Sequence, residues 1–279
     1  MTALAVAVAS AWGVWALWRV FVATRRGQLA EDLAFEGARV AYRHLWVLAE
    51  PLLDVISTSF VAGGILAAVL VAVLRRRWAL AIQVAVLVAG ANVTTQVVKH
   101  QVLDRPAFLG GWHFADNTLP SGHTTAAASV VAALLLVVPR AWRPAVALGG
   151  AGYTAVIGVS TLVGRWHRPS DVVAGVLVVL AWGALVCAFT PMTGLDSPRR
   201  QGDRLATPGS TAVGVLLLLA AAGFGVITTL ALGGLAGYSW GLPTGGDLTA
   251  YGGGVFAVLA SSALGFGALL LIRQATSRP

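Results

Sequence analysis

Eight hydrophobic segments, each about 20 residues long, govern what this chain of 279 residues can fold into. A helix needs about 20 apolar residues to cross the hydrocarbon of a bilayer, and it satisfies its own backbone hydrogen bonds there. The segments are residues 2–23, 53–74, 79–98, 122–139, 143–163, 171–191, 211–234 and 251–272. Because 57% of the residues are hydrophobic and 11% are charged, we expect an all-α polytopic membrane protein.

The basic residues fall in short clusters between these segments, although a net charge of +8 alone would suggest a nucleic-acid partner. Membrane topology explains the clusters, so no nucleic acid is expected. If both termini are cytoplasmic and all eight segments cross, the clusters at 75–77, 140–143 and 199–204 share the cytoplasmic side. The first segment has no basic residue before its apolar run, so we expect a retained helix rather than a signal peptide.

The region from residue 25 to 50 conflicts with this topology, because its arginines would lie near or in the first outside loop. Apolar and charged residues are arranged on opposite sides at helical spacing. The apolar set is Ala30, Leu33, Ala34, Ala38, Ala41, Leu45 and Leu48, and the charged set is Glu31, Asp32, Glu36, Arg39 and Arg43. The pattern fits an amphipathic helix lying on the bilayer, and a solvated connector is an equal alternative.

A polar stretch separates six hydrophobic segments from two glycine-rich ones. We therefore predict a six-helix core over residues 1–191, a cytoplasmic linker over 192–210, and two additional transmembrane helices within 211–279. Small residues in the last pair permit close helix packing. That pair is suited to packing within the chain, to binding a partner, or to forming a homo-oligomer.

Two loops, residues 99–123 and 164–171, hold the only lysine and four of the five histidines. Both face outward in the predicted topology. Ionisable groups at membrane depth cost about 2.5–3.5 kcal/mol each on insertion scales, so such a cluster favours a functional site. The candidates are Lys99, Arg105, His123, Arg165, His167, Arg168 and Asp171. Cations, two histidines and one carboxylate suit the binding and cleavage of a phosphate ester.

Local spacing suggests a role for the residues around the two histidines. Ser121 suits the N-cap of a helix that begins near Gly122, where free backbone N–H groups can bind an oxyanion. His167 and Asp171 are four residues apart, so the carboxylate can hold one imidazole nitrogen and leave the other free to attack phosphorus. His123 is then the group that protonates the leaving alcohol.

These residues resemble the three signature blocks of the type 2 phosphatidic acid phosphatase (PAP2) superfamily, which contains integral-membrane lipid phosphatases. The blocks are Lys, six residues, Arg-Pro; Pro-Ser-Gly-His; and Ser-Arg, five residues, His, three residues, Asp. The second block is complete at residues 120–123, and the third matches at Ser160, His167 and Asp171. In layout the resemblance covers the first six helices and leaves out the last two.

The resemblance implies hydrolysis of a phosphorylated membrane lipid without a metal or another cofactor. It implies that His167 is the nucleophile and forms a phosphohistidine, that Asp171 orients it, and that His123 is the acid. The phosphate-binding residues that it implies are Lys99, Arg105, Ser121 and Gly122.

The first block departs from the family pattern in its spacing. Five residues rather than six separate Lys99 from Arg105. On a continuous helix this spacing would leave the two side chains about 120° apart. Either the backbone leaves the helix before Pro106, as the proline favours, or Lys99 reaches the site by its length.

The third block departs in its arginine, which is replaced here by Thr161. Arg165 lies one helical turn further on, on the same face if the helix persists, so we predict that it is the replacement phosphate ligand. Arg168 is the second choice. Both arginines also fit a different interpretation, in which they are interfacial anchors that extend to lipid headgroups.

The sequence thus predicts a lipid phosphatase of a bacterial plasma membrane, with its active site on the extracytoplasmic side. Richness in Ala, Gly, Val and Arg with a single Lys is typical of a bacterium of high genomic G+C. By analogy with the family, and because the site is expected to face outward, a polyprenyl (di)phosphate is the favoured substrate, and phosphatidate and phosphatidylglycerol phosphate are the others. Two alternatives are phosphoryl transfer to an acceptor other than water, and a non-catalytic lipid-phosphate-binding or transport protein.

Overall fold

The computed structural model describes residues 2–54, 63, 66, 70, 78–109, 117–189, 208–235 and 246–276. Every regular element among these residues is a helix. The α-helices are α1 (Thr2–Leu17), α2 (Arg25–Asp54), α4 (Trp78–Val97), α5 (Gly122–Val137), α6 (Arg143–Val163), α7 (Pro169–Ala188), α8 (Pro208–Leu235) and α9 (Gly246–Thr276). Two π-helical turns, Trp18–Val22 and Val98–Val102, continue α1 and α4, and a 3-10 turn, Arg140–Trp142, precedes α6.

Six helical segments of the described chain are long and apolar enough to cross a membrane. They are Thr2–Val22, Ala79–Val102, Arg140–Val163, Pro169–Ala188, Gly209–Gly234 and Gly246–Thr276, and α5 is apolar but shorter. The predicted class, an all-α multi-pass membrane protein, is confirmed. The predicted span at 53–74 and the linker at 192–210 fall almost wholly outside the described residues.

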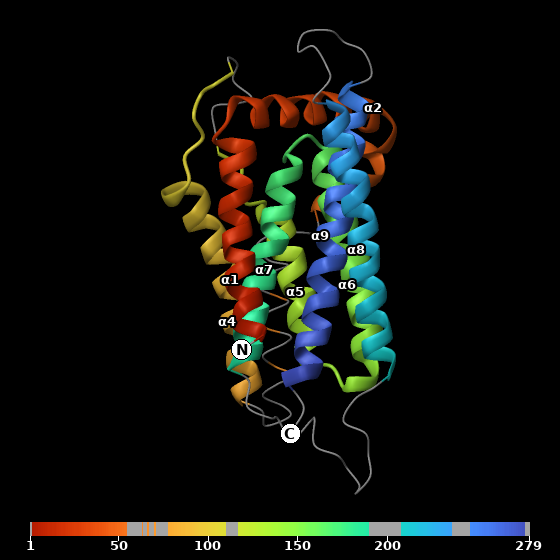
Figure 1. Cartoon of the computed structure of the whole chain (residues 1–279). Coiled ribbons are helices and arrows are strands. Elements are labelled where there is room, and N and C mark those ends of the chain that lie inside the picture. The colour runs from red at the N-terminus through yellow and green to blue at the C-terminus, as the bar shows by residue number, and fades with distance from the viewer. Residues whose placement is uncertain are drawn as a thin grey trace, which may run out of the picture.

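The long helices run side by side, and α2 lies across one end of the bundle (Figure 1). The start of α1 and the end of α9 lie at the opposite end. Helix α9 packs against α2, α6, α7 and α8, and α1 packs against α7. The two helices that follow the polar stretch are therefore packed against the earlier ones within this chain.

Helix α2 is the amphipathic segment anticipated between residues 30 and 48, and it is longer at both ends. Of the two alternatives left open by the pattern, the structure has the helix rather than a connector. Several apolar side chains of its second half are exposed, among them Val40, Leu45 and Leu48, as suits a helix in contact with a bilayer. The inner face differs from the prediction, because Glu31 is buried on the same side as Ala34 and Ala38.

The starts of α5 and α7 lie in direct contact because small groups meet there. The Ser121 backbone N–H donates to the Asp171 carbonyl oxygen at 2.8 Å. A Cβ atom added at Gly175 would come within 3.0 Å of the Ser121 carbonyl oxygen and 3.1 Å of the Thr125 hydroxyl oxygen. Glycine at this position therefore lets the two motif-bearing helices approach closely.

Gly37→Ala tests the packing of α2 on the start of α9. A Cβ atom there would lie 2.2 Å from the Asp247 carbonyl oxygen, so we expect destabilisation of about 1–3 kcal/mol from overpacking. The matched control is Gly152→Ala in α6, where nothing lies within 4 Å of the added atom. Thermal unfolding of the purified protein in detergent measures both. Equal melting temperatures for the two variants would contradict the packing of α2 on α9.

Candidate active site

The residues of the three motif blocks meet where α2 crosses the bundle. They come from the end of α4, the start of α5, the loop between α6 and α7, and the start of α7. In this way the fold brings residues from 99 to 171 of the sequence to one end of the helices. The same end is covered by α2, which packs on α6 and α9.

His167 and Asp171 form the pair that their spacing predicts. Nδ1 of His167 lies 3.3 Å from Oδ2 of Asp171, and both side chains are buried. Pro169 is the first residue of α7, and Oδ2 of Asp171 also accepts the backbone N–H of Arg168 at 2.9 Å. Because a carboxylate only accepts hydrogen bonds, the pair assigns the ring proton to Nδ1 and leaves Nε2 with its lone pair.

The loop before α7 turns sharply to place His167. Helix α6 ends at Val163, and Arg165 takes a left-handed backbone with φ of 58°. The Thr161 carbonyl then accepts from the backbone N–H groups of Trp166, at 3.0 Å, and His167, at 3.4 Å. Thr161 itself is fully buried, and its hydroxyl donates to the Gly158 carbonyl within α6.

His123 lies in the first turn of α5 and faces His167. The two imidazole centroids are 5.9 Å apart. The predicted N-cap is confirmed, since Oγ of Ser121 accepts the Thr124 backbone N–H at 3.3 Å. The amides of Gly122 and His123 lie in the first turn, where a helix supplies no intrahelical acceptor. An oxyanion near His167 would find these donors beside it.

The chain leaves the helix between Lys99 and Arg105. Lys99 belongs to the π-helical turn Val98–Val102, and Leu103 is extended. Of the two explanations for the short spacing, the structure has the one in which the helix ends before Pro106. Asn117, a residue that sequence reasoning did not single out, donates to the carbonyls of Lys99, Leu103 and Leu119 and so ties the end of α4 to the start of α5.

Two guanidinium groups lie close together at this end. Burial lowers the pKa of Arg105, and the neighbouring Arg168 lowers it further. Nη1 of Arg168 donates to the Thr118 hydroxyl at 3.0 Å. Lys99 is close enough to Asp171 for their charges to interact. Like charges held together in a half-buried place form a favourable environment for an anion.

Arg165 extends toward α2. Its Nη2 lies 3.0 Å from Oε1 of Glu36, and its Nε donates to the Phe35 carbonyl at 3.2 Å. The Cζ atom also lies 4.2 Å from the centroid of the Phe35 ring. Because α6 ends two residues earlier, the helical-face argument that placed Arg165 beside Thr161 does not apply. Its role as a phosphate ligand stays a prediction.

Aromatic residues of α2 extend the site in a way that sequence reasoning missed. Trp166 lies between His123, at a centroid distance of 5.2 Å, and Trp46, at 5.8 Å. Tyr42 stacks on Trp46 at 5.2 Å. These residues form a wall beside His123, on α2 and the loop before α7. The only signal in the sequence was the position of Trp166 directly before His167.

Glu31 is another site residue that sequence reasoning missed. Its side chain is 2% exposed, and Oε1 accepts the hydroxyl of Ser170, the residue before Asp171. Burial, and then the charge of Asp171, raise the pKa of Glu31 to about 7. The sequence pattern assigned Glu31 to the charged face of this helix, so its burial was not expected. The available signal was the i, i+3 spacing from Gln28 through Glu31 to Ala34, all of which are buried.

Comparison with known proteins supports the motif assignment. The model of the PAP2 superfamily matches residues 80–194, which run from α4 through α7. The resemblance drawn from the motif blocks is therefore confirmed, and residues 80–194 are similar to the PAP2 superfamily. Members of this superfamily are phosphatases, so the match supports a phosphate-ester hydrolase. Neither a curated protein nor a solved structure gives a significant match.

Glu31→Gln tests the buried carboxyl. Its folded-state pKa of about 7 lies above the ordinary 4.5, so its contribution to stability is fully present below the ordinary pKa and is lost as pH rises through about 7. We expect Glu31→Gln to gain about 1–3 kcal/mol relative to the parent between pH 5 and pH 8. Thermal unfolding at both pH values measures this.

The control for this experiment is Glu50→Gln, which removes an exposed carboxyl from the same helix. It should leave the pH dependence of the melting temperature as in the parent. Parallel curves for the parent and Glu31→Gln would show that Glu31 does not titrate in the folded protein over this range.

Proposed function

We propose that this protein is a metal-independent lipid phosphatase that hydrolyses the phosphomonoester or diphosphate of a membrane lipid. The observation that carries the proposal is the hydrogen bond between His167 and Asp171, with His123 facing the same imidazole across 5.9 Å between ring centroids. Binding alone needs cations, whereas a held nucleophile and a second histidine suit bond cleavage. The PAP2 match to residues 80–194 supports the same reaction class.

In the proposed first step, Nε2 of His167 attacks phosphorus. The P–O bond to the lipid breaks, a P–N bond forms, and His123 gives a proton to the leaving oxygen. Asp171 stabilises the positive charge that develops on the His167 ring, as the carboxylate of a catalytic triad does. Water then attacks phosphorus, His123 accepts its proton, and the P–N bond breaks to release phosphate and restore both histidines.

The charges beside the histidines would hold the transferring group. We propose that Lys99, Arg105 and Arg168 neutralise its oxygens, together with the backbone N–H groups after Ser121. Hydrogen bonds to charged groups are strongest in a site that excludes water. The burial of His167 and Arg168, at 8% and 4% exposure, gives this site such an environment.

The proposed substrate is a polyprenyl phosphate or diphosphate, with phosphatidate and phosphatidylglycerol phosphate as the other candidates. The proposed setting is the extracytoplasmic face of a bacterial plasma membrane. The exposed apolar side chains of α2 support a lipid substrate, because they suit contact with a bilayer surface beside the site. A headgroup could then reach the cations while its chain stays in hydrocarbon.

The decisive measurement is phosphate release from a panel of polyprenyl phosphate, polyprenyl diphosphate, phosphatidate and phosphatidylglycerol phosphate by the purified protein. We expect release from one class by the parent and no measurable release by His167→Ala. His123→Ala should lose about 100-fold to 10,000-fold in kcat, the usual contribution of a general acid. His44→Ala, an exposed histidine of α2, is the matched control. No release by the parent from any substrate would overturn the proposal.

Labelled water in the same assay separates hydrolysis from transfer. Incorporation of its oxygen into the released phosphate is the expected result, because water attacks phosphorus in the second step. A product that carries the phosphoryl group on another acceptor would assign the protein to phosphotransferases instead.

Comparison of Arg165→Ala with Arg168→Ala tests which arginine serves in place of the one missing at Thr161. Arg168 lies beside Arg105 and Asp171, so its loss should raise KM and lower kcat/KM by about tenfold or more. Arg165 can bind phosphate only if its guanidinium group leaves Glu36. If it does, Glu36→Gln should lower KM, because the guanidinium group would no longer be held by that carboxylate. Full activity in Arg165→Ala would remove Arg165 from the phosphate site.

A further inference from the structure

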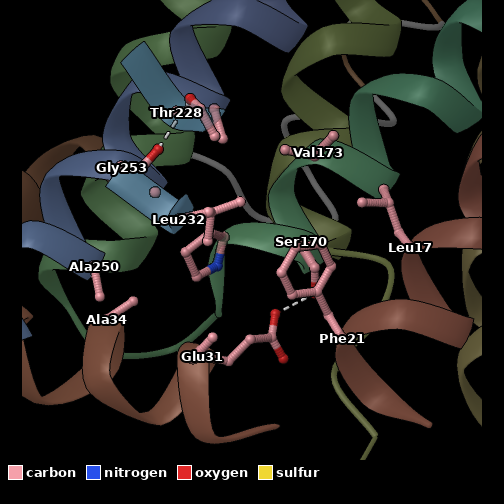
Figure 2. Close-up of a pocket in the computed structure, with 14 residues that line it drawn as sticks. Leu17, Phe21, Glu31, Ala34, Ser170, Val173, Thr228, Leu232, Ala250 and Gly253 are labelled. Carbon is pink, nitrogen blue, oxygen red and sulfur yellow. Dashed lines mark hydrogen bonds between the residues drawn. The ribbon is translucent and has the colours of Figure 1, made fainter. Parts of the chain in front are cut away.

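A cavity of about 200 Å³ lies beside the first turn of α7, where Pro169, Ser170 and Val173 line it (Figure 2). Its walls come from α2, α7, α8, α9, and the end of α1 with its π-helical turn. Leu17, Val173 and Leu232 line it, and small side chains of α9 such as Ala257 leave it open. An apolar cavity of about 150 Å³ is large enough to hold benzene, so this one can hold a length of hydrocarbon.

The occupant of this cavity must come from the membrane. Four of the five helices that form the walls, α1, α7, α8 and α9, have the length and hydropathy of membrane spans. Leu232 is 36% exposed, so the α8 wall is open to the surroundings of the bundle. If these helices cross a bilayer, lipid is the nearest source of an apolar occupant.

Glu31 and Ser170 form the polar end of the cavity. Figure 2 shows them hydrogen-bonded to each other, and the Ser170 hydroxyl is the donor to Oε1 of Glu31. With that hydrogen in use, an ionised Glu31 and the Ser170 oxygen offer only acceptors. Oε2 of Glu31 is buried and has no hydrogen-bond partner among the described residues. A ligand that donates a hydrogen bond would satisfy it.

A phosphate is disfavoured at this end. A fully ionised phosphate only accepts hydrogen bonds, so it cannot satisfy Oε2 of Glu31. The charge of Asp171 raises the pKa of Glu31, whereas Arg105 and Arg168, which we propose to bind phosphate beside His167, lower it. A neutral hydroxyl fits this end, and a hydrocarbon chain fits the walls.

We propose that this cavity binds a membrane lipid alcohol, the product that hydrolysis of a lipid phosphomonoester at His167 would leave, with its hydroxyl donating to the Glu31–Ser170 pair. The inference rests on the proposed function for the identity of the alcohol. In this proposal, the cations beside His167 bind the phosphorylated lipid, and the acceptors of Glu31 and Ser170 in the cavity bind the free alcohol.

The experiment measures binding without turnover, so its result is independent of the phosphatase assay. The probe is a 15-carbon prenyl alcohol that carries a diazirine close to its hydroxyl, irradiated with the purified protein in lipid nanodiscs. Burial and the charge of Asp171 raise the pKa of Glu31 to about 7. The assay is therefore run at pH 8, above that pKa, so that most of Glu31 is ionised. Peptide mass spectrometry then locates the label.

We expect label on the cavity segments of α2, α7 and α9, and loss of that label on addition of the unmodified alcohol. The methyl ether of the same alcohol cannot donate a hydrogen bond, so it should compete about tenfold or more weakly. Equal competition by alcohol and ether would overturn the role of the Glu31–Ser170 pair. Label confined to outward-facing positions of the bundle would overturn the cavity as the binding site.

Variants of α9 provide a matched pair. Ala257→Phe fills the cavity and should reduce the specific label about tenfold or more, whereas Ala260→Phe, one turn away and outside the lining, should retain it. Val173→Phe fills the same cavity from α7 and gives a second reading if Ala257→Phe fails to fold. Unchanged labelling in a folded cavity-filling variant would refute the proposal. A parent that binds the alcohol but releases no phosphate would leave the cavity site standing and overturn only its link to the reaction.

Discussion

The geometry of the site depends on the hydrogen bonds made by Asp171 in the first turn of α7. Its carboxylate accepts from the His167 ring and from the Arg168 backbone, and its backbone carbonyl accepts from the N–H of Ser121. These bonds fix the loop before α7 and the start of α5 relative to one another. Because Asp171 is fully buried, removal of a partner leaves a buried polar group, which is far costlier than loss of the same bond in water.

The first turn of α7 also lies close to charges of both signs. The cations come from the end of α4 and the loop before α7, and the additional carboxyl comes from α2 through Glu31. Repulsion between Arg105 and Arg168 is relieved by an anion, whereas the carboxyl pair of Glu31 and Asp171 is relieved by a proton or a hydrogen-bond donor. A helix that lies across the end of the bundle thus contributes to the electrostatics of residues more than 130 positions later in the chain.

Much of the fold and the centre of the site could be predicted because short-range rules determine them. Hydrophobic length located the helices, the N-cap rule located Ser121, and a spacing of four residues brought Asp171 to His167. Tertiary packing decided the rest. The direction of the Arg165 side chain depends on the left-handed backbone of Arg165 itself, two residues after the end of α6. A pattern of helical spacing cannot reveal such a turn. Glu31 is buried because α2 packs against α7 and α9, which hydrophobic periodicity alone does not specify.

The matched segment explains only part of what the chain must do with a lipid. Residues 80–194 supply every histidine, lysine and arginine proposed for the chemistry, but they supply only the α7 wall of the apolar cavity. The other walls come from α1, α2, α8 and α9, on both sides of the segment in sequence. Because α9 packs against α6 and α7 as well as α2 and α8, the two helices beyond the polar stretch form part of the surroundings of Asp171. If the cavity binds a lipid chain as proposed, that binding depends on helices on both sides of the segment, whereas the proposed cleavage of the phosphate rests on residues within it.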